Sequence, residues 1–264
     1  MGFFVLTLLV IWLPLAAPIT LLIRDENLVT ILTMGLLFGE FLILLQVWGR
    51  KVYKTPHLIK SYGLVGTRQN GWDLLTGLGV GLLFTFSLFV VEGIFGWITF
   101  GPPTDQFVRI VLEGLLSALG IGLAEELVFR GWLLDELQRD YSRRTVLWAG
   151  AITFAVLHFL KPLGEIIRTL PGFPGLVLLG LILIWAKRSR FGRLGLPIGL
   201  HAGLVWGYYI INVGQLVQYS EQVSPWITGV DGNPIAGVMG LLFLGVLAFW
   251  IRQQLHSRRD TVRY

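Results

Sequence analysis

Hydrophobic residues recur along the chain in runs long enough to predict membrane-spanning helices. A helix rises about 1.5 Å per residue, so about 20 apolar residues cross the roughly 30 Å hydrocarbon core of a bilayer. No long polar linker separates the runs, and residues 1–264 are therefore predicted to form a single integral membrane domain. The expected fold class is an all-α polytopic transmembrane bundle of about eight helices. The expected spans, two of them short, are residues 3–23, 28–48, 73–99, 109–137, 145–160, 173–187, 194–213 and 235–251.

The composition also indicates a membrane protein. Hydrophobic residues make up 54% of the chain and charged residues 14%, with a mean hydropathy of +0.71, which is outside the usual range of soluble domains. The opening run lacks a preceding basic region, so we expect a first spanning helix rather than a cleaved signal peptide. The chain has no cysteine, which excludes a disulfide, a thiolate metal site and a cysteine nucleophile.

Basic residues are concentrated in alternate connections between the expected spans. Short cytoplasmic loops collect Lys and Arg, so this alternation places both termini in the cytoplasm. It also explains the net charge of +5 without a nucleic-acid partner. Sixteen of the 21 basic residues lie on the cytoplasmic side, namely Arg50, Lys51, Lys54, Lys60, Arg68, Arg139, Arg143, Arg144, Lys187, Arg188, Arg190, Arg193, Arg252, Arg258, Arg259 and Arg263.

Two adjacent glutamates and an arginine interrupt the fourth run, in the segment AEELVFRGWLLDEL. In a helix, Glu126 and Arg130 are four residues apart and form a favourable ion pair, whereas Glu125 points about 100° away from Glu126. An unpaired carboxylate in a membrane is a candidate general base. The alternative is that both glutamates are solvated beyond the cytoplasmic end of the helix. Trp132, if it marks the interface, argues against that alternative because Glu125 lies about 10 Å deeper.

Two histidines are expected at a depth similar to that of Glu125. His158 is about 15 Å inward from Trp148 along its helix, and His201 is about 10 Å inward from the start of its helix at Leu194. Either histidine alone is more often a hydrogen-bonded packing residue than a functional one. Two imidazoles at matched depth with an unpaired carboxylate favour a catalytic site.

These residues, in this order, resemble the motifs of the CPBP family, which comprises the CAAX prenyl endopeptidases and the bacteriocin-processing proteins, also called Abi. The segment EELVFR is similar to the EExxxR motif, and FAVLH, which begins at Phe154, is similar to the FxxxH motif. His201 corresponds to the histidine of the third motif. The resemblance covers about residues 110–213, the expected catalytic core. Val205 departs from the family pattern, which has Asn or Asp four residues after that histidine.

The resemblance implies an intramembrane glutamic endopeptidase that needs no metal and no cofactor. It implies that Glu125 and His158 activate a water molecule, that His201 helps to hold the oxyanion, and that Glu126, Arg130 and Phe154 support the site. The implied partners are the lipid bilayer and a membrane-associated peptide or protein substrate, which in eukaryotic relatives is a prenylated CAAX peptide. The expected location is multi-pass in a membrane, the cell (inner) membrane if the source is prokaryotic, with the site open toward the cytoplasm.

Three alternatives remain open from the sequence. One Glu and two His could bind zinc as in a metallopeptidase, although no HExxH motif is present. A transporter could use Glu40, Glu92 and Glu113, which are also expected inside spans. The chain could also be a non-catalytic family member that binds a partner. This alternative stays open because Val205 stands where the family pattern has Asn or Asp.

Overall fold

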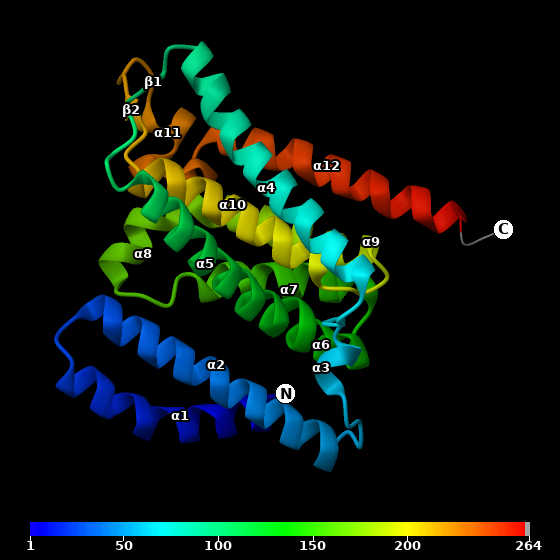
Figure 1. Ribbon diagram of the computed structural model, residues 1–264. Helices are drawn as coiled ribbons and strands as arrows, with labels where there is room; N and C mark the ends of the chain where they lie inside the picture. Colours follow the sequence, from blue (N-terminus) through cyan, green and yellow to red (C-terminus); the bar gives the residue numbers. More distant parts are fainter. Residues whose placement is uncertain (262–264) are drawn as a thin grey trace. The chain divides into compact units, whose positions relative to one another are not determined.

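The structure, a computed structural model, describes residues 1–261 and is built almost entirely of helices (Figure 1). Arg263, which the charge pattern assigns to the cytoplasmic tail, lies outside the described residues. The elements are α1 (Gly2–Leu22), α2 (Glu26–Lys51), α3 (Leu58–Ser61), α4 (Arg68–Ile94), β1 (Ile98–Phe100), α5 (Phe107–Glu126), the π-helix η1 (Leu127–Leu133), α6 (Leu134–Asp140), α7 (Arg143–Leu157), α8 (Leu163–Thr169), η2 (Leu170–Gly172), α9 (Phe173–Ser189), α10 (Gly195–Val213), β2 (Val217–Tyr219), α11 (Pro225–Thr228), η3 (Val230–Gly232), η4 (Pro234–Ala236) and α12 (Val238–Thr261).

The chain divides into two compact units, Met1–Ser61 and Tyr62–Tyr264. In the first unit, α1 and α2 pack as an antiparallel pair, in which the ring of Phe4 lies 5.5 Å from that of Trp48 and Trp12 Nε1 donates to the Thr33 carbonyl at 3.0 Å. The expected catalytic core, about residues 110–213, lies entirely within the second unit.

Seven helical segments of the described chain are long and apolar enough to cross a membrane, which confirms the expected polytopic all-α class. The eighth expected span, residues 145–160, corresponds to the shorter helix α7. This helix runs antiparallel to α9 along its whole length, since Arg188 Nη2 donates to the Arg143 carbonyl at 3.2 Å and the Phe159 and Phe173 rings are 5.7 Å apart at the other end. The described chain thus has seven candidate spans where the sequence predicts eight, because α7, at 15 residues, is too short to be counted as one.

Glycines bring α4 and α10 into backbone contact. A Cβ atom added at Gly77 would lie 2.4 Å from the Leu196 carbonyl oxygen, and one added at Gly199 would lie 2.0 Å from that of Leu74. Small residues at four-residue spacing allow such approach between membrane helices. By contrast, the Gly35/Gly39 pair, which has the same spacing in α2, has nothing within 4 Å. The close contact fixes α10, which carries His201.

Helix α5 packs antiparallel on α10, so the carboxyl end of α5 lies beside the amino-terminal half of α10. A Cβ atom added at Gly122 would lie 3.0 Å from the Ile198 carbonyl oxygen, and Gly114 lies against the Tyr209 ring. Figure 1 shows α5, α10 and α4 running side by side. This arrangement sets the end of α5, with its two glutamates, next to His201.

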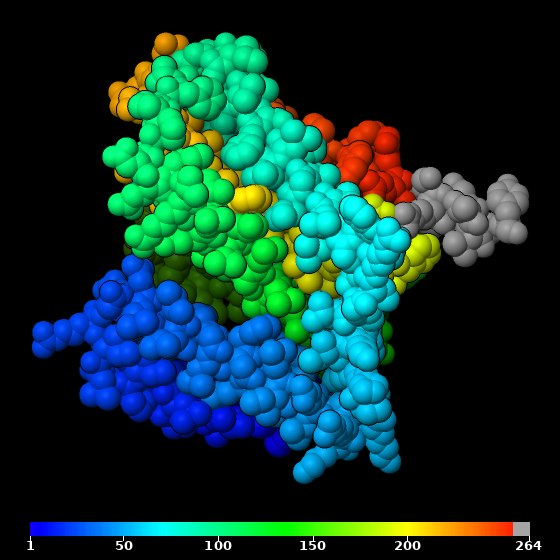
Figure 2. Space-filling model, viewed as in Figure 1, coloured from blue at the N-terminus to red at the C-terminus, as the bar shows by residue number. Residues whose placement is uncertain are grey.

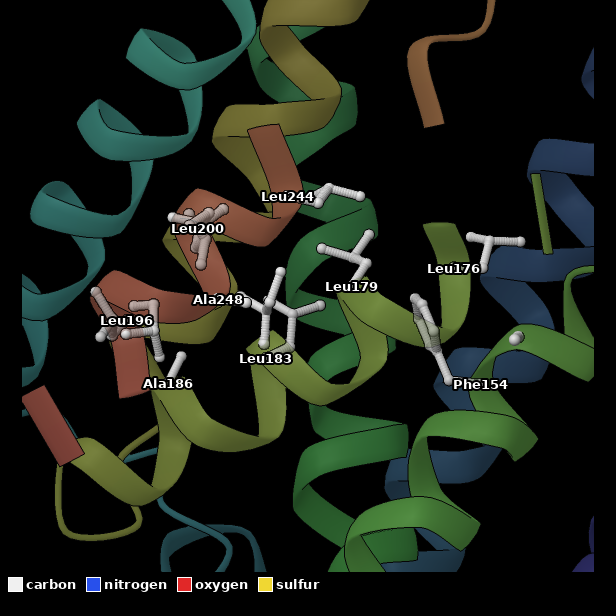
Figure 3. Packing of buried hydrophobic residues seen from close by; sticks show 13 residues of the cluster. Phe154, Leu176, Leu179, Leu183, Ala186, Leu196, Leu200, Leu244 and Ala248 are labelled. Carbon is white, nitrogen blue, oxygen red and sulfur yellow. The ribbon is translucent and has the colours of Figure 1, made fainter. Parts of the chain in front are cut away.

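Apolar side chains fill the space between α7, α9, α10 and α12. Phe154, Leu183 and Leu200 are fully buried in this core, and Figure 3 shows them on three different helices. Other large apolar side chains are exposed, such as Leu83 on α4 and Leu116 on α5, at 63% and 73%. They belong to the cyan and green helices whose outer surface Figure 2 shows. Exposed apolar rows on spanning helices are the surface expected to face lipid.

A short two-stranded ribbon joins the ends of α4 and α10 that lie away from the basic connections. β1 pairs with β2 antiparallel, with Ile98 opposite Tyr219 and Phe100 opposite Val217. Residues 214–234, which follow α10, contain β2, α11 and η3.

Candidate active site

The helix that carries the two glutamates changes its winding immediately after them. α5 ends at Glu126, and the next seven residues form a π-helix in which the backbone N–H of Leu134 donates to the carbonyl of Phe129, five residues earlier. The expected span 109–137 is thus helical throughout but contains this irregularity. Single π-helical turns inside α-helices are frequently found at functional sites.

Glu126 and Arg130 form the expected ion pair, and both are buried. Arg130 Nη1 lies 2.8 Å from Glu126 Oε1, with 1% of the arginine and none of the glutamate side chain exposed. The guanidinium carbon also lies 4.2 Å from the centre of the Phe154 ring. His201 Nδ1 lies 2.9 Å from the same carboxylate oxygen. Glu126 Oε1 therefore has two partners, whereas Glu126 Oε2 is buried without a hydrogen-bond partner in the described part of the chain.

Glu125 lies between the two histidines. Its Oε2 atom is 3.7 Å from His158 Nε2 and 3.9 Å from His201 Nε2. This oxygen is buried without a hydrogen-bond partner among residues 1–261, although 31% of the side chain is exposed. The three residues that the sequence proposes as catalytic are thus brought together, from α5, the end of α7 and α10.

Hydrogen bonds fix which nitrogen of each imidazole faces Glu125. His158 Nδ1 lies 2.7 Å from the carbonyl oxygen of Phe154, which can only accept, so Nδ1 carries the proton. His201 Nδ1 donates in the same way to the carboxylate of Glu126. The Nε2 atoms are then free to accept a proton at the centre of the site.

The two imidazoles and the Arg130 guanidinium pack around the Phe154 ring. The ring centres of His158 and His201 lie 4.4 Å and 6.1 Å from it, and Arg130 covers it as described above. Figure 3 shows Phe154 at the edge of the apolar core. Its place in the FAVLH segment is therefore explained by packing against the ionic groups.

Sequence reasoning missed one contact at the π-helix and the burial of Trp132. Lys187 Nζ donates to the Arg130 carbonyl at 2.6 Å, although the charge pattern assigns Lys187 to a cytoplasmic loop. Its long side chain reaches inward from the end of α9. Trp132, expected to mark the interface, is only 7% exposed and packs inside the protein, because the π-helix turns it inward. The depth of Glu125 is better counted from Asp140, about 20 Å along the helix.

The comparisons with known proteins agree with this geometry. Residues 107–207 match the family described as type II CAAX prenyl endopeptidase Rce1-like. This segment belongs to the CPBP, or CAAX protease, family. The match covers α5 to most of α10 and includes Glu125, Glu126, Arg130, Phe154, His158 and His201. No significant match was found among curated proteins or among solved structures. The expected resemblance is thereby confirmed, and the family is one of proteases.

A cavity of about 280 Å³ adjoins the two histidines of the CAAX protease segment. Its walls are mainly apolar and come from α4, α7, α9, α10, η4 and α12. Val205 and Tyr208 both line it, so the position at which the family has Asn or Asp faces the same space as His201. The lining also includes Thr85, Leu88, Phe89, Leu176, Leu204, Asn233 and Phe243, of which sequence reasoning singled out none.

The other acidic residues expected inside spans are not part of this site. Glu113 pairs with Arg109 at 2.7 Å on an exposed face of α5. Glu92 is fully buried in α4, and neither of its carboxylate oxygens has a hydrogen-bond partner within the described part of the chain. Glu40 lies in the first unit. Among the side chains described, those of residues 1–255, no group of three or more His, Asp or Glu has the arrangement of a metal-binding set.

Proposed function

We propose that this protein is an intramembrane endopeptidase in which Glu125 and His158 activate a water molecule. The substrate is a membrane-associated peptide, which includes the class of prenylated peptides. The observation that carries the proposal is that Nε2 of His158 and Nε2 of His201 lie 3.7 Å and 3.9 Å from Glu125 Oε2. That oxygen has no hydrogen-bond partner in the described part of the chain, and the tautomer of each imidazole is fixed by its Nδ1 contact. Membership of the matched segment in a protease family supports it.

The chemistry follows from the donors and acceptors of the site. Glu125 and His158 Nε2 are acceptors, so a water molecule between them is held by its own hydrogens and directs a lone pair outward. As the water oxygen attacks the peptide carbonyl carbon, its proton passes to Glu125 or His158. The C–O bond forms, and an oxyanion develops on the former carbonyl oxygen.

His201 stabilises this oxyanion when its Nε2 is protonated. The imidazolium so formed is itself stabilised by Glu126, which accepts from Nδ1 at 2.9 Å. Collapse of the tetrahedral intermediate breaks the C–N bond, and the proton held by Glu125 or His158 is delivered to the leaving amine. Val205 has no donor, so His201 carries the oxyanion role without the amide or acid that the family pattern places beside it.

The proposed location is a multi-pass position in the cell membrane, the inner membrane for a prokaryotic source, with the site deep in the bilayer. His158 is about 22 Å along α7 from Arg143 at 1.5 Å per residue, similar to the distance between Glu125 and Asp140. The site is then well inside the hydrocarbon region. Access from the cytoplasm stays a prediction, made from the depths of Glu125, His158 and His201 estimated from the sequence.

The test is hydrolysis of a library of prenylated and unprenylated peptides by the purified protein in lipid nanodiscs. Glu125→Gln keeps the size of the side chain but removes the base, and we expect kcat to fall at least about 100-fold. Glu113→Gln is the matched control, because that carboxylate is in an exposed ion pair. Full activity of Glu125→Gln would end the proposal.

Metal content is measured on the same samples. Stoichiometric zinc that is lost together with activity on chelation would replace the metal-free scheme with a metallopeptidase.

A second candidate function is a non-catalytic member that binds a peptide without cleaving it, and Val205 in the wall of the cavity is the observation that favours it. Saturable peptide binding with no cleavage by the wild-type protein would assign this function.

A further inference from the structure

A second, polar pocket adjoins the apolar cavity of the proposed active site. Its volume is about 340 Å³, and it shares two lining residues, Phe89 and Tyr208, with the apolar cavity. The two spaces therefore adjoin at Phe89 and Tyr208. The polar pocket lies beneath the β1–β2 ribbon, at the end of α10 away from the basic connections, and is lined further by Ile211, Asn212, Gln215, Val217, Gln218, Tyr219 and Gly232.

The polar pocket is lined by amides and hydroxyls but by no charged side chain. Asn212 Nδ2 donates to the Tyr208 hydroxyl oxygen at 2.6 Å, which leaves the Tyr208 hydrogen available as a donor. Burial raises the pKa of Tyr219, so its hydroxyl stays protonated, and it donates to the Gly232 carbonyl at 3.5 Å. A lining of neutral donors and acceptors suits an uncharged polar ligand and offers no counter-charge to a phosphate.

The free edge of β2 adds backbone groups to the same pocket. Ser220 N–H donates to the Trp97 carbonyl and Gly101 N–H donates to the Leu216 carbonyl, both at 2.9 Å. In an antiparallel pair, hydrogen-bonded and non-hydrogen-bonded positions alternate. The register therefore makes Val217 and Tyr219 the non-bonded positions, whose N–H and C=O groups point away from β1. Both residues line the polar pocket.

We propose that the polar pocket binds the substrate peptide as an added strand on the free edge of β2, while the apolar part of the same peptide passes Tyr208 into the apolar cavity. The substrate class is then a peptide with an apolar stretch at the scissile bond and an uncharged polar stretch next to it. Edge strands bind extended peptides through main-chain hydrogen bonds in this way. This inference rests on the proposed function and extends it to substrate selection on the face away from the basic connections, opposite to the cytoplasmic opening that the sequence predicts.

Strand addition is tested by binding, independently of cleavage. The probes are two fluorescein-labelled peptides of about ten residues, a length of about 33 Å when extended, with an apolar half and a Ser/Thr/Gln half in either order. Anisotropy is measured on the full chain in nanodiscs. Val217→Pro removes the edge N–H without removing a β1–β2 hydrogen bond, and proline is tolerated at sheet edges. Val217→Ala is the matched control, because it keeps the N–H.

We expect Val217→Pro to weaken binding of the better peptide about tenfold, and Val217→Ala to bind it like the wild type. Alternate N-methylation of the polar half should produce the same loss with the unaltered protein, which guards against misfolding of the proline variant. Equal binding by both variants together with no effect of N-methylation, or no binding of either peptide, would overturn the inference.

Cleavage separates this inference from the proposed function. If the wild type cleaves a peptide that Glu125→Gln does not cleave, and Val217→Pro changes neither binding nor cleavage of that peptide, the proposed strand site is wrong and the proposed protease function is retained. Strand binding with no cleavage leaves the strand site standing and removes the protease.

Discussion

His158 Nε2 lies 3.7 Å from Glu125 Oε2, while Nδ1 of the same ring is held by the Phe154 carbonyl at 2.7 Å. The backbone thus aims the imidazole at the carboxylate. We expect His158→Ala to lower kcat by about 10²–10⁴-fold, the usual contribution of general acid–base catalysis. Steady-state kinetics on a cleaved peptide measures this. His57→Ala, at an exposed position before α3, is the control and should keep wild-type kcat. Equal activity of the two variants would remove His158 from the mechanism.

The ion pair between Arg130 and Glu126 is expected to be required for stability as well as for activity. Arg130→Met leaves the Glu126 carboxylate buried with only His201 as partner, and loss of one member of a buried pair costs about 3–5 kcal/mol. Arg109→Met breaks an exposed pair with the same four-residue spacing, for which little or no loss of stability is expected. Thermal unfolding in detergent compares the two. A similarly small loss of stability in both variants would show that burial does not determine how much the Arg130–Glu126 pair contributes to stability.

The contact between α4 and α10 predicts a sharp difference between two glycines. The Cβ atom of Gly199→Ala would lie 2.0 Å from the Leu74 carbonyl oxygen, so the helices must separate. We expect a loss of about 1–3 kcal/mol, the typical cost of overpacking, and reduced kcat because α10 carries His201. Gly79→Ala faces open space and should be neutral or stabilising by up to about 1 kcal/mol. If the two variants have the same unfolding temperature, the close packing is absent.

Val205 offers a test by gain of function. Val205→Asn places an amide donor in the wall that His201 shares, and one oxyanion donor contributes about 10²–10³-fold in kcat where its geometry is right. We expect kcat of the asparagine variant to exceed that of the wild type at least tenfold, whereas the similarly sized Val205→Leu should not exceed it. Peptide cleavage rates at saturating substrate give the comparison. An inactive Val205→Asn protein would show that the wall is not near the developing charge.

The absence of cysteine makes topology directly measurable. Tyr141→Cys lies in the basic connection between α6 and α7, and Asp105→Cys lies in the opposite connection before α5. We expect a membrane-impermeant maleimide to label Asp105→Cys but not Tyr141→Cys in intact right-side-out vesicles, and to label both after permeabilisation. Labelling of Tyr141→Cys from outside would reverse the assigned orientation.

Much of the architecture follows from apolar run length, and the Glu126–Arg130 pair follows from helical spacing. Convergence of Glu125, His158 and His201 was expected from matched depth, and the distances between their side chains now support the site residues proposed from the sequence.

The partners of these residues were less accessible to sequence reasoning. The bond between His201 and Glu126 depends on the rotation of α5 about its axis, which run length does not report. Lys187 was assigned by charge alone, whereas its reach to the Arg130 carbonyl depends on packing of α9. The β1–β2 ribbon comes from three-residue strands, too short for a recognisable alternation.

The π-helix of residues 127–133 amounts to one surplus residue in an otherwise regular rod. Deleting Val128 would let this stretch rewind as ordinary α-helix with α6 close to its present orientation, yet it would shorten the separation of Glu126 and Arg130 from four positions to three. The four-residue spacing of the ion pair and the present orientation of α6 therefore coexist only while that surplus is kept. Chain length within this single turn is as much a requirement of the site as the identity of its acids and bases.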